Sequence, residues 1–394
     1  MVLKEIPAGA EMPFVTTLAG TVIRRGTTTE TDPMLAARDL GRQLALPVRA
    51  LSMVFCDPAM ARQSAFLPAL RRELGSAPIV ACSTAGEIDP TGYRSGTCTG
   101  FSLPAGAYHA AATRIDSVRS LTPATARAAV DQVENELQAL GVRIDPEHAF
   151  AILLVDGLSM AEEAVSYALQ SALGRIELVG GSAGDGLEFG ATFVAADDRF
   201  VEDAAVLVLV VTELPFRVFR TQHFEPTSTK LVVTVADARN RLLIEIDGRP
   251  AAEAYADVLG LDVAQLVPEV FARNPLLVRM GGSWFVRSIR AVQRDGSMQT
   301  FCAIDEGLVL TLGTCRPMPE NLDQVLTRIT REIGRPQVVF GCDCILRRLQ
   351  AFALDQQDVM AAIFADHDVV GFNTYGEQIG AVHVNQTFTG VALT

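Results

Sequence analysis

The sequence lacks an excess of basic residues, and this shortage argues against two classes of partner. Its 394 residues include 33 Lys and Arg against 46 Asp and Glu, so the formal net charge is −13 at pH 7. Proteins that bind nucleic acid usually carry a basic stripe, and docking on an anionic membrane needs clustered positive charge. We therefore expect no nucleic acid and no membrane among the partners. Any anionic ligand must be held by a local group of arginines.

Long apolar runs are missing too. The most apolar run, AAVLVLVV at 204–211, is far shorter than the about 20 residues of a membrane-spanning helix, and it predicts a buried strand. The N-terminal string MVLKEIPAGAEMPF has no charged region followed by a long apolar stretch, so we expect no secretory signal. The seven cysteines are an odd number, which favours reduced thiols in the cytoplasm over a disulfide framework.

The most informative feature that is present is an internal repeat. In three segments a buried apolar strand is followed by a helical stretch and by a second apolar strand that ends in [Ser/Thr]-x-Gly-[Asp/Glu]. The strand pairs are LSMVFCDP with IVACSTAGEI, FAILLVDGLS with LVGGSAGDGL, and QVVFGCDCI with VVGFNTYGEQI, beginning at residues 51, 150 and 337. A β stretch with a hairpin-like close follows each pair. Because parallel strands need a helical crossover, the repeat predicts an α/β fold of mixed α+β type, with mixed sheets covered by helices.

The repeated turns carry polar side chains at the ends of their strands. The aligned hydroxyls are Thr84, Ser182 and Thr374, and the aligned acids are Glu87, Asp185 and Glu377. Ligands of open α/β sheets bind outside the carboxyl ends of the strands. Such a turn can also be purely structural, because glycine adopts backbone conformations that other residues do not. The acids could do acid–base work, although nothing in the sequence pairs them with a nucleophile. No HExxH helix and no kinase signature is present, so we predict that the protein is not an enzyme.

Helix starts and a domain boundary can also be predicted. Asp32, Asp57 and Thr122 each precede a proline and are expected to cap helices. Ser159 and Glu162 have the spacing of a capping box, which predicts a helix over 159–173. The string FEPTSTK interrupts two β-rich stretches at 224–230. We therefore predict a lead-in at 1–29 and two domains at 30–228 and 229–394.

The third copy of the turn is the strongest candidate for a site. Read as one strand, 381–391 places His383, Asn385, Thr387 and Thr389 on one face, with Gln386 out of character among the apolar residues of the other. Two interpretations stay open. The polar face meets water and His383 is an ordinary surface residue, or His383 lines a polar cavity where it is available to a metal or a heme iron.

Cysteines and arginines near this copy offer further candidates. Cys342 and Cys344 point to the same side of a strand and, with His383, could form part of a zinc site. Structural zinc usually takes four ligands with spacings such as C-x2-C, and no second pair exists, so reduced structural thiols are favoured over zinc. Arg347 and Arg348 belong either to a solvated helical face or to a contact with ligand carboxylates.

Several strings resemble those of FIST-domain proteins, over roughly 30–394. They are ACSTAGEI, GGSAGDGLEFGATFV, IDGRPAAEAY and GFNTYGEQ followed by HVNQTFTG. The C-terminal strings, together with CDCILRRL, are similar to those of NosP proteins, which are heme-binding nitric-oxide sensors that act beside histidine kinases or cyclic-di-GMP enzymes. The predicted domains then correspond to FIST N and FIST C.

The resemblance implies a cytoplasmic heme sensor with a gas ligand and a signalling partner such as a histidine kinase. A second copy of the chain, in a homodimer, is a further candidate partner. His383 becomes the expected axial ligand, with Tyr375 and Cys344 in reserve, since His, Tyr and Cys are the usual protein ligands of heme iron. Asn385 is expected to take part in binding the cofactor, and Arg347 or Arg348 would neutralise the heme propionates. Two alternatives remain: a sensor of small molecules such as amino acids with its pocket at the glycine-rich turn 180–186, and an enzyme that uses the acidic turns.

Overall fold

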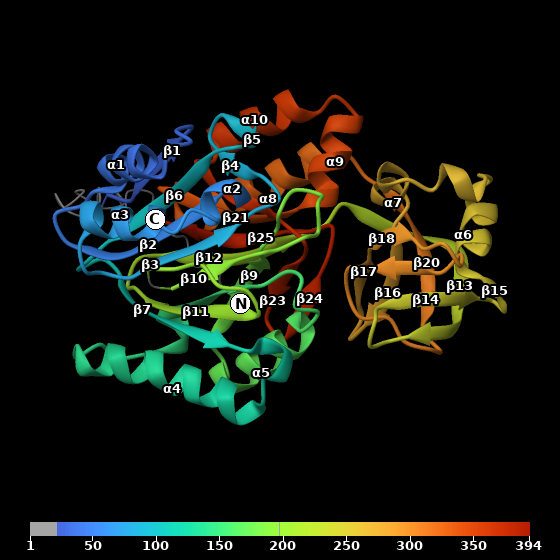
Figure 1. Ribbon diagram of the computed structural model, residues 1–394, viewed down its shortest axis with the longest axis horizontal. Helices are drawn as coiled ribbons and strands as arrows, with labels where there is room; N and C mark the ends of the chain where they lie inside the picture. The colour runs from blue at the N-terminus through green and yellow to red at the C-terminus, as the bar shows by residue number, and fades with distance from the viewer. Residues whose placement is uncertain (1–21, 197) are drawn as a thin grey trace, which may run out of the picture.

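The fold is built from three related units and one insert, as a computed structural model of residues 22–196 and 198–394 shows (Figure 1). The predicted lead-in at 1–29 and the N-terminal string examined for a secretory signal lie largely outside these described residues. The three predicted strand–helix–strand repeats are confirmed, because β2 pairs with β3, β8 with β9 and β21 with β22, each pair parallel. Helices cover the outer faces of the sheets, so the mixed α/β class is confirmed.

The first unit covers 24–104. Its elements are β1 (Arg24–Thr28), α1 (Pro33–Leu44), β2 (Arg49–Cys56), α2 (Pro58–Ala61), α3 (Phe66–Leu74), β3 (Ile79–Ser83), β4 (Glu87–Asp89), β5 (Gly92–Arg94) and β6 (Cys98–Pro104). The second unit covers 109–211. Its elements are β7 (His109–Asp116), a 3-10 turn (Val118–Ser120), α4 (Pro123–Ala139), a 3-10 turn (Pro146–His148), β8 (Ala149–Val155), α5 (Glu162–Leu173), β9 (Glu177–Ser182), β10 (Val194–Ala195) and β11 (Ala204–Val211).

The third unit begins with β12, is interrupted by the insert at 224–315, and resumes at α8. Its elements are β12 (Phe216–Thr221), α8 (Met318–Ile333), β21 (Val338–Cys344), α9 (Ile345–Ala353), α10 (Gln357–Asp366), β22 (Val369–Thr374), β23 (Glu377–Ile379), β24 (Val382–Val384) and β25 (Phe388–Leu393). The insert contains β13 (Phe224–Asp237), β14 (Leu242–Ile246), β15 (Arg249–Pro250), α6 (Ala251–Leu259), a 3-10 turn (Val263–Gln265), α7 (Pro268–Arg273), β16 (Leu276–Met280), β17 (Ser283–Arg287), β18 (Ile289–Val292), β19 (Met298–Thr300) and β20 (Val309–Cys315).

The three units are joined in a ring by exchanged strands. The sheets run β1-β6-β2-β3-β10, β24-β23-β9-β8-β11-β7 and β12-β25-β21-β22-β4-β5. The second strand of each repeat therefore pairs with a strand from another unit: β3 with β10, β9 with β23, and β22 with β4. As a consequence, strands from the predicted domains 30–228 and 229–394 share two sheets, and β13 runs across the predicted boundary.

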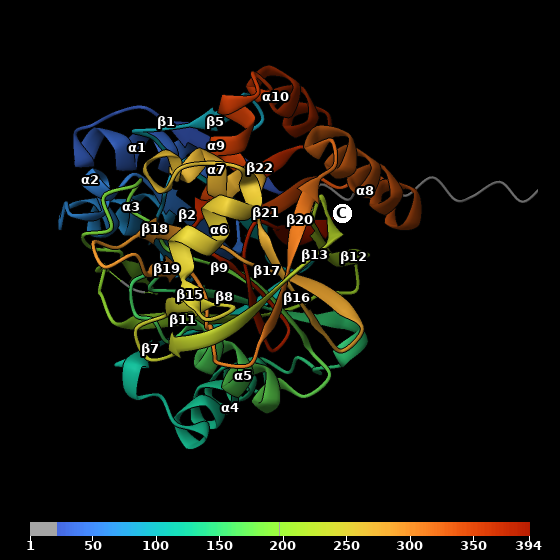
Figure 2. The same cartoon turned by 90° about the vertical axis from the view of Figure 1, so that its right-hand side faces the viewer.

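The largest core cluster lies where the inner faces of the three sheets meet. Phe55 stacks on Phe340 with 5.4 Å between ring centroids and on Phe372 with 4.9 Å. The insert has its own core around Tyr255 and Phe271 and projects from the side of the molecule (Figures 1 and 2). Within the described part of the chain, no helix is long and apolar enough to cross a membrane.

Local predictions were correct where a cap or turn decides the backbone. Asp32, Asp57 and Thr122 cap α1, α2 and α4 with their side chains. The capping box of Ser159 and Glu162 is wrong: α5 begins only at Glu162, after an Ala161 cap without a side-chain bond. The capping box does not form because the Glu162 carboxylate binds a buried arginine of the insert instead of the helix terminus.

The single strand predicted over 381–391 is also wrong. It is two strands, β24 and β25, because Gln386 adopts a left-handed backbone with φ 51°. The Gln386 side chain is buried, donates to the carbonyl of Ala272 (2.7 Å) and accepts from the Ser288 hydroxyl (3.0 Å). This break lets β24 join the sheet of the second unit while β25 stays in the sheet of the third.

Candidate functional site

The three repeated turns meet near the axis of the ring. The amide of Ala85 donates to the carbonyl of Asn373 (2.9 Å), that of Gly184 to Ser83 (3.1 Å), and that of Ser182 to Gly376 (2.8 Å). Each turn thus bonds to a turn of another unit. The carboxyl ends of the parallel strands converge here, where ligands of α/β sheets usually bind.

Two of the aligned acids fix their turns from the inside. The Glu377 carboxylate accepts from the hydroxyl (2.6 Å) and amide (3.2 Å) of Thr387 and from the hydroxyl of Thr374. Glu87 accepts in the same way from Thr97 (2.7 and 3.3 Å) and from the Thr84 hydroxyl (2.5 Å). Burial raises the pKa of Glu87 to about 7 and of Glu377 to about 8, against the lowering effect of these hydroxyls. These contacts account for both acids as structural groups that hold the turns in place.

The raised pKa of Glu377 predicts a pH-dependent stability. The folded chain holds the proton up to about pH 8, whereas the unfolded chain releases it near the ordinary value of 4.5, so stability falls as pH rises between these values. We expect the free energy of unfolding to drop by about 1–2 kcal/mol from about pH 6.5 to about pH 8. Glu377→Gln, which imitates the protonated acid, should abolish most of the drop in urea unfolding.

Glu87→Gln is the matched control for that measurement. Because the pKa of Glu87 is raised only to about 7, this variant should remove less of the drop above neutral pH. An equal drop in the wild type and in Glu377→Gln would contradict the assignment.

The third aligned acid and the nearby serine have equally structural contacts. Asp185 accepts from the amides of Phe189 (2.9 Å) and Gly190 (2.7 Å). Ser182 stands in GGSAG, a string with the GxSxG spacing of serine hydrolases, but no helix follows it as such a site requires. Its hydroxyl accepts from the Gln378 amide (2.9 Å), and that amide separates it from His383.

His383 lies on β24 and is buried, with 2% of its surface exposed, so the interpretation as a surface residue is wrong. Its Nδ1 is 3.2 Å from Gln378 Nε2, and its Nε2 has no hydrogen-bond partner. Burial lowers its pKa; the carboxylates of Glu163 and Glu162 oppose this and the nearby arginines add to it. The ring is therefore neutral at physiological pH, which is the form that binds metals.

The turn beneath the imidazole requires a glycine. A Cβ on Gly376 would lie 2.3 Å from His383 Cε1 and 2.6 Å from Asn385 Nδ2. Gln378 Oε1 and Asn385 Oδ1 are also buried without a partner. A buried polar atom without a partner costs about 1–3 kcal/mol, so three of them on one hairpin mark a place where a polar or metal-containing ligand is favourable. The donor chemistry of His383 fits a heme iron.

The two reserve ligands are held in their protonated forms. The Tyr375 hydroxyl donates to the Asp185 carboxylate and accepts from the Asp185 amide (3.2 Å). Burial raises the pKa of Tyr375 and also the pKa of the Cys344 thiol. Binding iron through either group would therefore require it to lose this proton, whereas the neutral imidazole already has the form that binds a metal.

The two predicted arginines have internal partners. Arg347 is fully buried, so the solvated-face interpretation is wrong for it; its Nε donates to Asp343 (2.5 Å) and its Nη1 lies 2.9 Å from His223 Nδ1. Arg348 donates to the Arg94 carbonyl (3.0 Å) and to the Ser95 hydroxyl (2.6 Å). A role for either in binding propionates stays a prediction.

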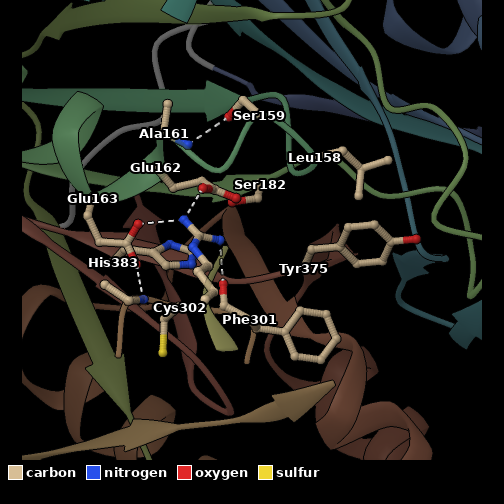
Figure 3. Close-up of polar contacts among 12 residues, drawn as sticks. Leu158, Ser159, Ala161, Glu162, Glu163, Ser182, Phe301, Cys302, Tyr375 and His383 are labelled. Carbon is tan, nitrogen blue, oxygen red and sulfur yellow. Dashed lines mark hydrogen bonds and ion pairs between the residues drawn. The ribbon is translucent and has the colours of Figure 1, made fainter. Parts of the chain in front are cut away.

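The structure adds an ion pair that the sequence did not reveal. Arg241, in the β13–β14 turn of the insert, donates to Glu162 and Glu163 at the start of α5, both at 2.5 Å (Figure 3). Glu163 also accepts from the Ala303 amide (2.6 Å). The pairs hold the insert against the second unit, beside His383. Partners about 80 residues apart leave no local pattern that could have predicted them.

The described cysteines are not gathered into a group that could hold a metal. All seven are free, and no group of three or more His, Cys, Asp or Glu side chains that could hold a metal occurs in residues 22–196 and 198–394. Cys342 belongs to the central core cluster and Cys344 to a separate cluster with Tyr375. The role of structural thiols accounts for both.

A cavity of about 310 Å³ lies against two of the turns, and His383 is not among its lining residues. Its walls come from the turns 84–86 and 185–188 and from Asp57, Arg62 and Ser95. It thus includes part of the glycine-rich turn that the sequence marked as a pocket for a small molecule.

The comparisons with known proteins agree with the repeated architecture. The FIST N domain matches residues 50–249, and the FIST C domain matches residues 251–380. No curated protein matches the chain. FIST domains are sensory domains of signal transduction. The two matches cover most of the sequence, and the chain belongs to the FIST family.

Proposed function

We propose that this FIST protein is a sensor that binds heme through His383 and reports a diatomic gas such as nitric oxide to a signalling partner. The observation that carries the proposal is the neutral, buried imidazole with an unpartnered Nε2. Heme would supply an iron that binds the gas. The partner would be a histidine kinase or an enzyme of cyclic-di-GMP signalling, and the chain itself would not be an enzyme.

The residues around His383 connect it to the turns on the axis and to the insert. Gln378 and Gly376 link the ring to the turns on the axis, and its carboxylate neighbours Glu162 and Glu163 hold the insert through Arg241. His383 is only 2% exposed, and both α5 of the second unit and β17 of the insert pack against its strand, so the proposal includes a shift of the insert on ligand binding. An insert with two positions is the kind of element that a partner protein can read.

The test is a titration of the purified protein with hemin, followed by absorption. We expect a stoichiometric Soret band that shifts with nitric oxide in the wild type. In His383→Ala the band should be lost or shifted. His148→Ala is the control, because His148 is only half-buried, pairs with Glu213, and precedes the start of β8, at the opposite end of that strand from the turns.

The other outcomes are equally decisive. A band that is unchanged in His383→Ala would keep heme and move the ligand to Tyr375 or Cys344. Absence of a band in the wild type would overturn the heme proposal.

In that case the second candidate, a sensor of a small metabolite such as an amino acid, becomes the leading one. The cavity of about 310 Å³ favours it, since Arg62 and the acids Asp57 and Asp185 offer both charges that an amino acid would need.

A further inference from the structure

Four arginines are buried in the described chain, and one of them lacks a strong acceptor. Arg49 donates to three carbonyls and a hydroxyl within 3.3 Å, Arg241 binds two carboxylates, and Arg347 binds Asp343. Arg287, on β17, is 9% exposed. Its contacts are the carbonyl of its neighbour Val286 (3.3 Å) and the sulfur of Met280 (3.7 Å), and its Nε has no partner.

A second guanidinium without a carboxylate lies close to the first. Arg220 on β12 stacks on the Phe285 ring, 4.7 Å from its centroid, and its buried Nη1 has no partner. Phe285 and Arg287 are two residues apart on β17, so they share one face of that strand. Burial lowers the pKa of Arg220. The described residues place no carboxylate within ion-pair distance of either arginine.

Of the two arginines, Arg287 lies near the hairpin that carries His383, and Arg220 is linked to it through the Phe285 ring. Strand β17 packs against β24, and the positive charge of Arg287 helps to lower the pKa of His383. The acids that act on His383 are Glu162 and Glu163, whose carboxylates already bind Arg241 and the Ala303 amide. Arg287 therefore stays unpaired although acidic side chains are close.

We infer that Arg287 and Arg220 form a carboxylate-binding subsite beside His383. A guanidinium cannot escape burial by losing its proton, and a buried charge without a partner is strongly unfavourable. Its five donors match a carboxylate in a bidentate pair. The carboxylate belongs to a heme propionate or to a free small organic acid. The first source rests on the proposed heme function, and the second is independent of it.

Two measurements with Arg287→Met separate these sources. In the first, without heme, thermal unfolding is compared in acetate and in chloride at equal ionic strength. In the second, the dissociation constants of hemin and of hemin dimethyl ester, which has no carboxylate, are compared. Removing an unpaired buried charge should leave the variant folded, which circular dichroism checks. Arg279→Met is the control, because Arg279 is exposed on the adjacent strand β16 and stacks on Trp284.

The expected results differ by source. For a free acid, acetate raises the unfolding midpoint of the wild type and of Arg279→Met but not of Arg287→Met. For a propionate, the wild type binds hemin about 10-fold more tightly than the ester, which corresponds to about 1.4 kcal/mol, and Arg287→Met binds both equally. Arg220→Met should weaken the same preference.

The inference is overturned if neither the acetate effect nor the preference for hemin depends on Arg287. If neither hemin nor its ester binds the wild type, the heme proposal fails while the acetate measurement still decides the subsite.

Discussion

Asp343→Ala should lower the free energy of unfolding by about 3–5 kcal/mol, the usual cost of removing one partner of a buried ion pair. Asp343 and Arg347 are both fully buried, and the pair is 2.5 Å long. The substitution leaves the Arg347 guanidinium with a single hydrogen-bond partner among the described residues, Nδ1 of the neutral His223 ring. It also deprives the Tyr93 hydroxyl of its acceptor at 2.6 Å. The midpoint of urea unfolding measures the loss.

The double variant Asp343→Leu with Arg347→Met is the control for this experiment. Replacing a whole buried pair by apolar residues is often close to neutral. Here Tyr93 still loses its acceptor, so we expect about 1–3 kcal/mol of the loss to remain. A double variant as unstable as Asp343→Ala would show that the unpaired guanidinium is not the cause.

This pair matters because it joins units that are far apart in the sequence. Tyr93 comes from β5 of the first unit, Asp343 from β21 and Arg347 from α9 of the third. The same network reaches His223, just before the insert. Loss of the Asp343 carboxylate should therefore loosen the contact between the first and third units as well as the local turn.

The sequence predicted the parts of the fold that depend on local patterns. Parallel strands need a crossover that is usually a helix, so apolar strands joined through a helix predict parallel pairs, and all three were found. The pairing of β4 with β22 and of β23 with β9 could not be predicted. Those short strands have the same pattern whichever unit they join, and only the packing of the whole ring decides between the partners.

The predictions about the site were likewise correct where they depended on local patterns and failed where they depended on packing between distant segments. The polar character of the His383 hairpin is visible in the sequence, but its burial is not, because the insert that covers it comes from residues 224–315. Gln386 had been noticed as out of character, and it marks the break between β24 and β25. The arginines chosen from the sequence, Arg347 and Arg348, have internal partners, whereas Arg287 carried no local signal.

Gly376→Ala should weaken hemin binding at least about 10-fold without altering the imidazole itself, a loss of about 1.4 kcal/mol or more. The added Cβ would lie 2.3 Å from His383 Cε1 and 2.6 Å from Nε2, so the ring must leave its position. The ring cannot move freely because it is packed among buried residues. Overpacking of this kind lowers the free energy of unfolding by about 1–3 kcal/mol. Hemin titration of the variant, beside its urea midpoint, measures both effects.

The internal repeat supplies a matched control in Gly86→Ala. Gly86 is the equivalent residue of the first unit, and its φ of 140° is close to the 155° of Gly376, so both substitutions strain the backbone similarly. The Cβ at Gly86 would meet the guanidinium of Arg348, the end of a flexible side chain, at 1.5 Å. With the carboxylate subsite at Arg287 and Arg220, as inferred above, rather than at Arg348, Gly86→Ala should lose stability but keep its hemin affinity. Equal losses of affinity in both variants would mean that the position of His383 does not control hemin binding. A loss of affinity only in Gly376→Ala would assign the binding site to His383 without any substitution of the histidine itself.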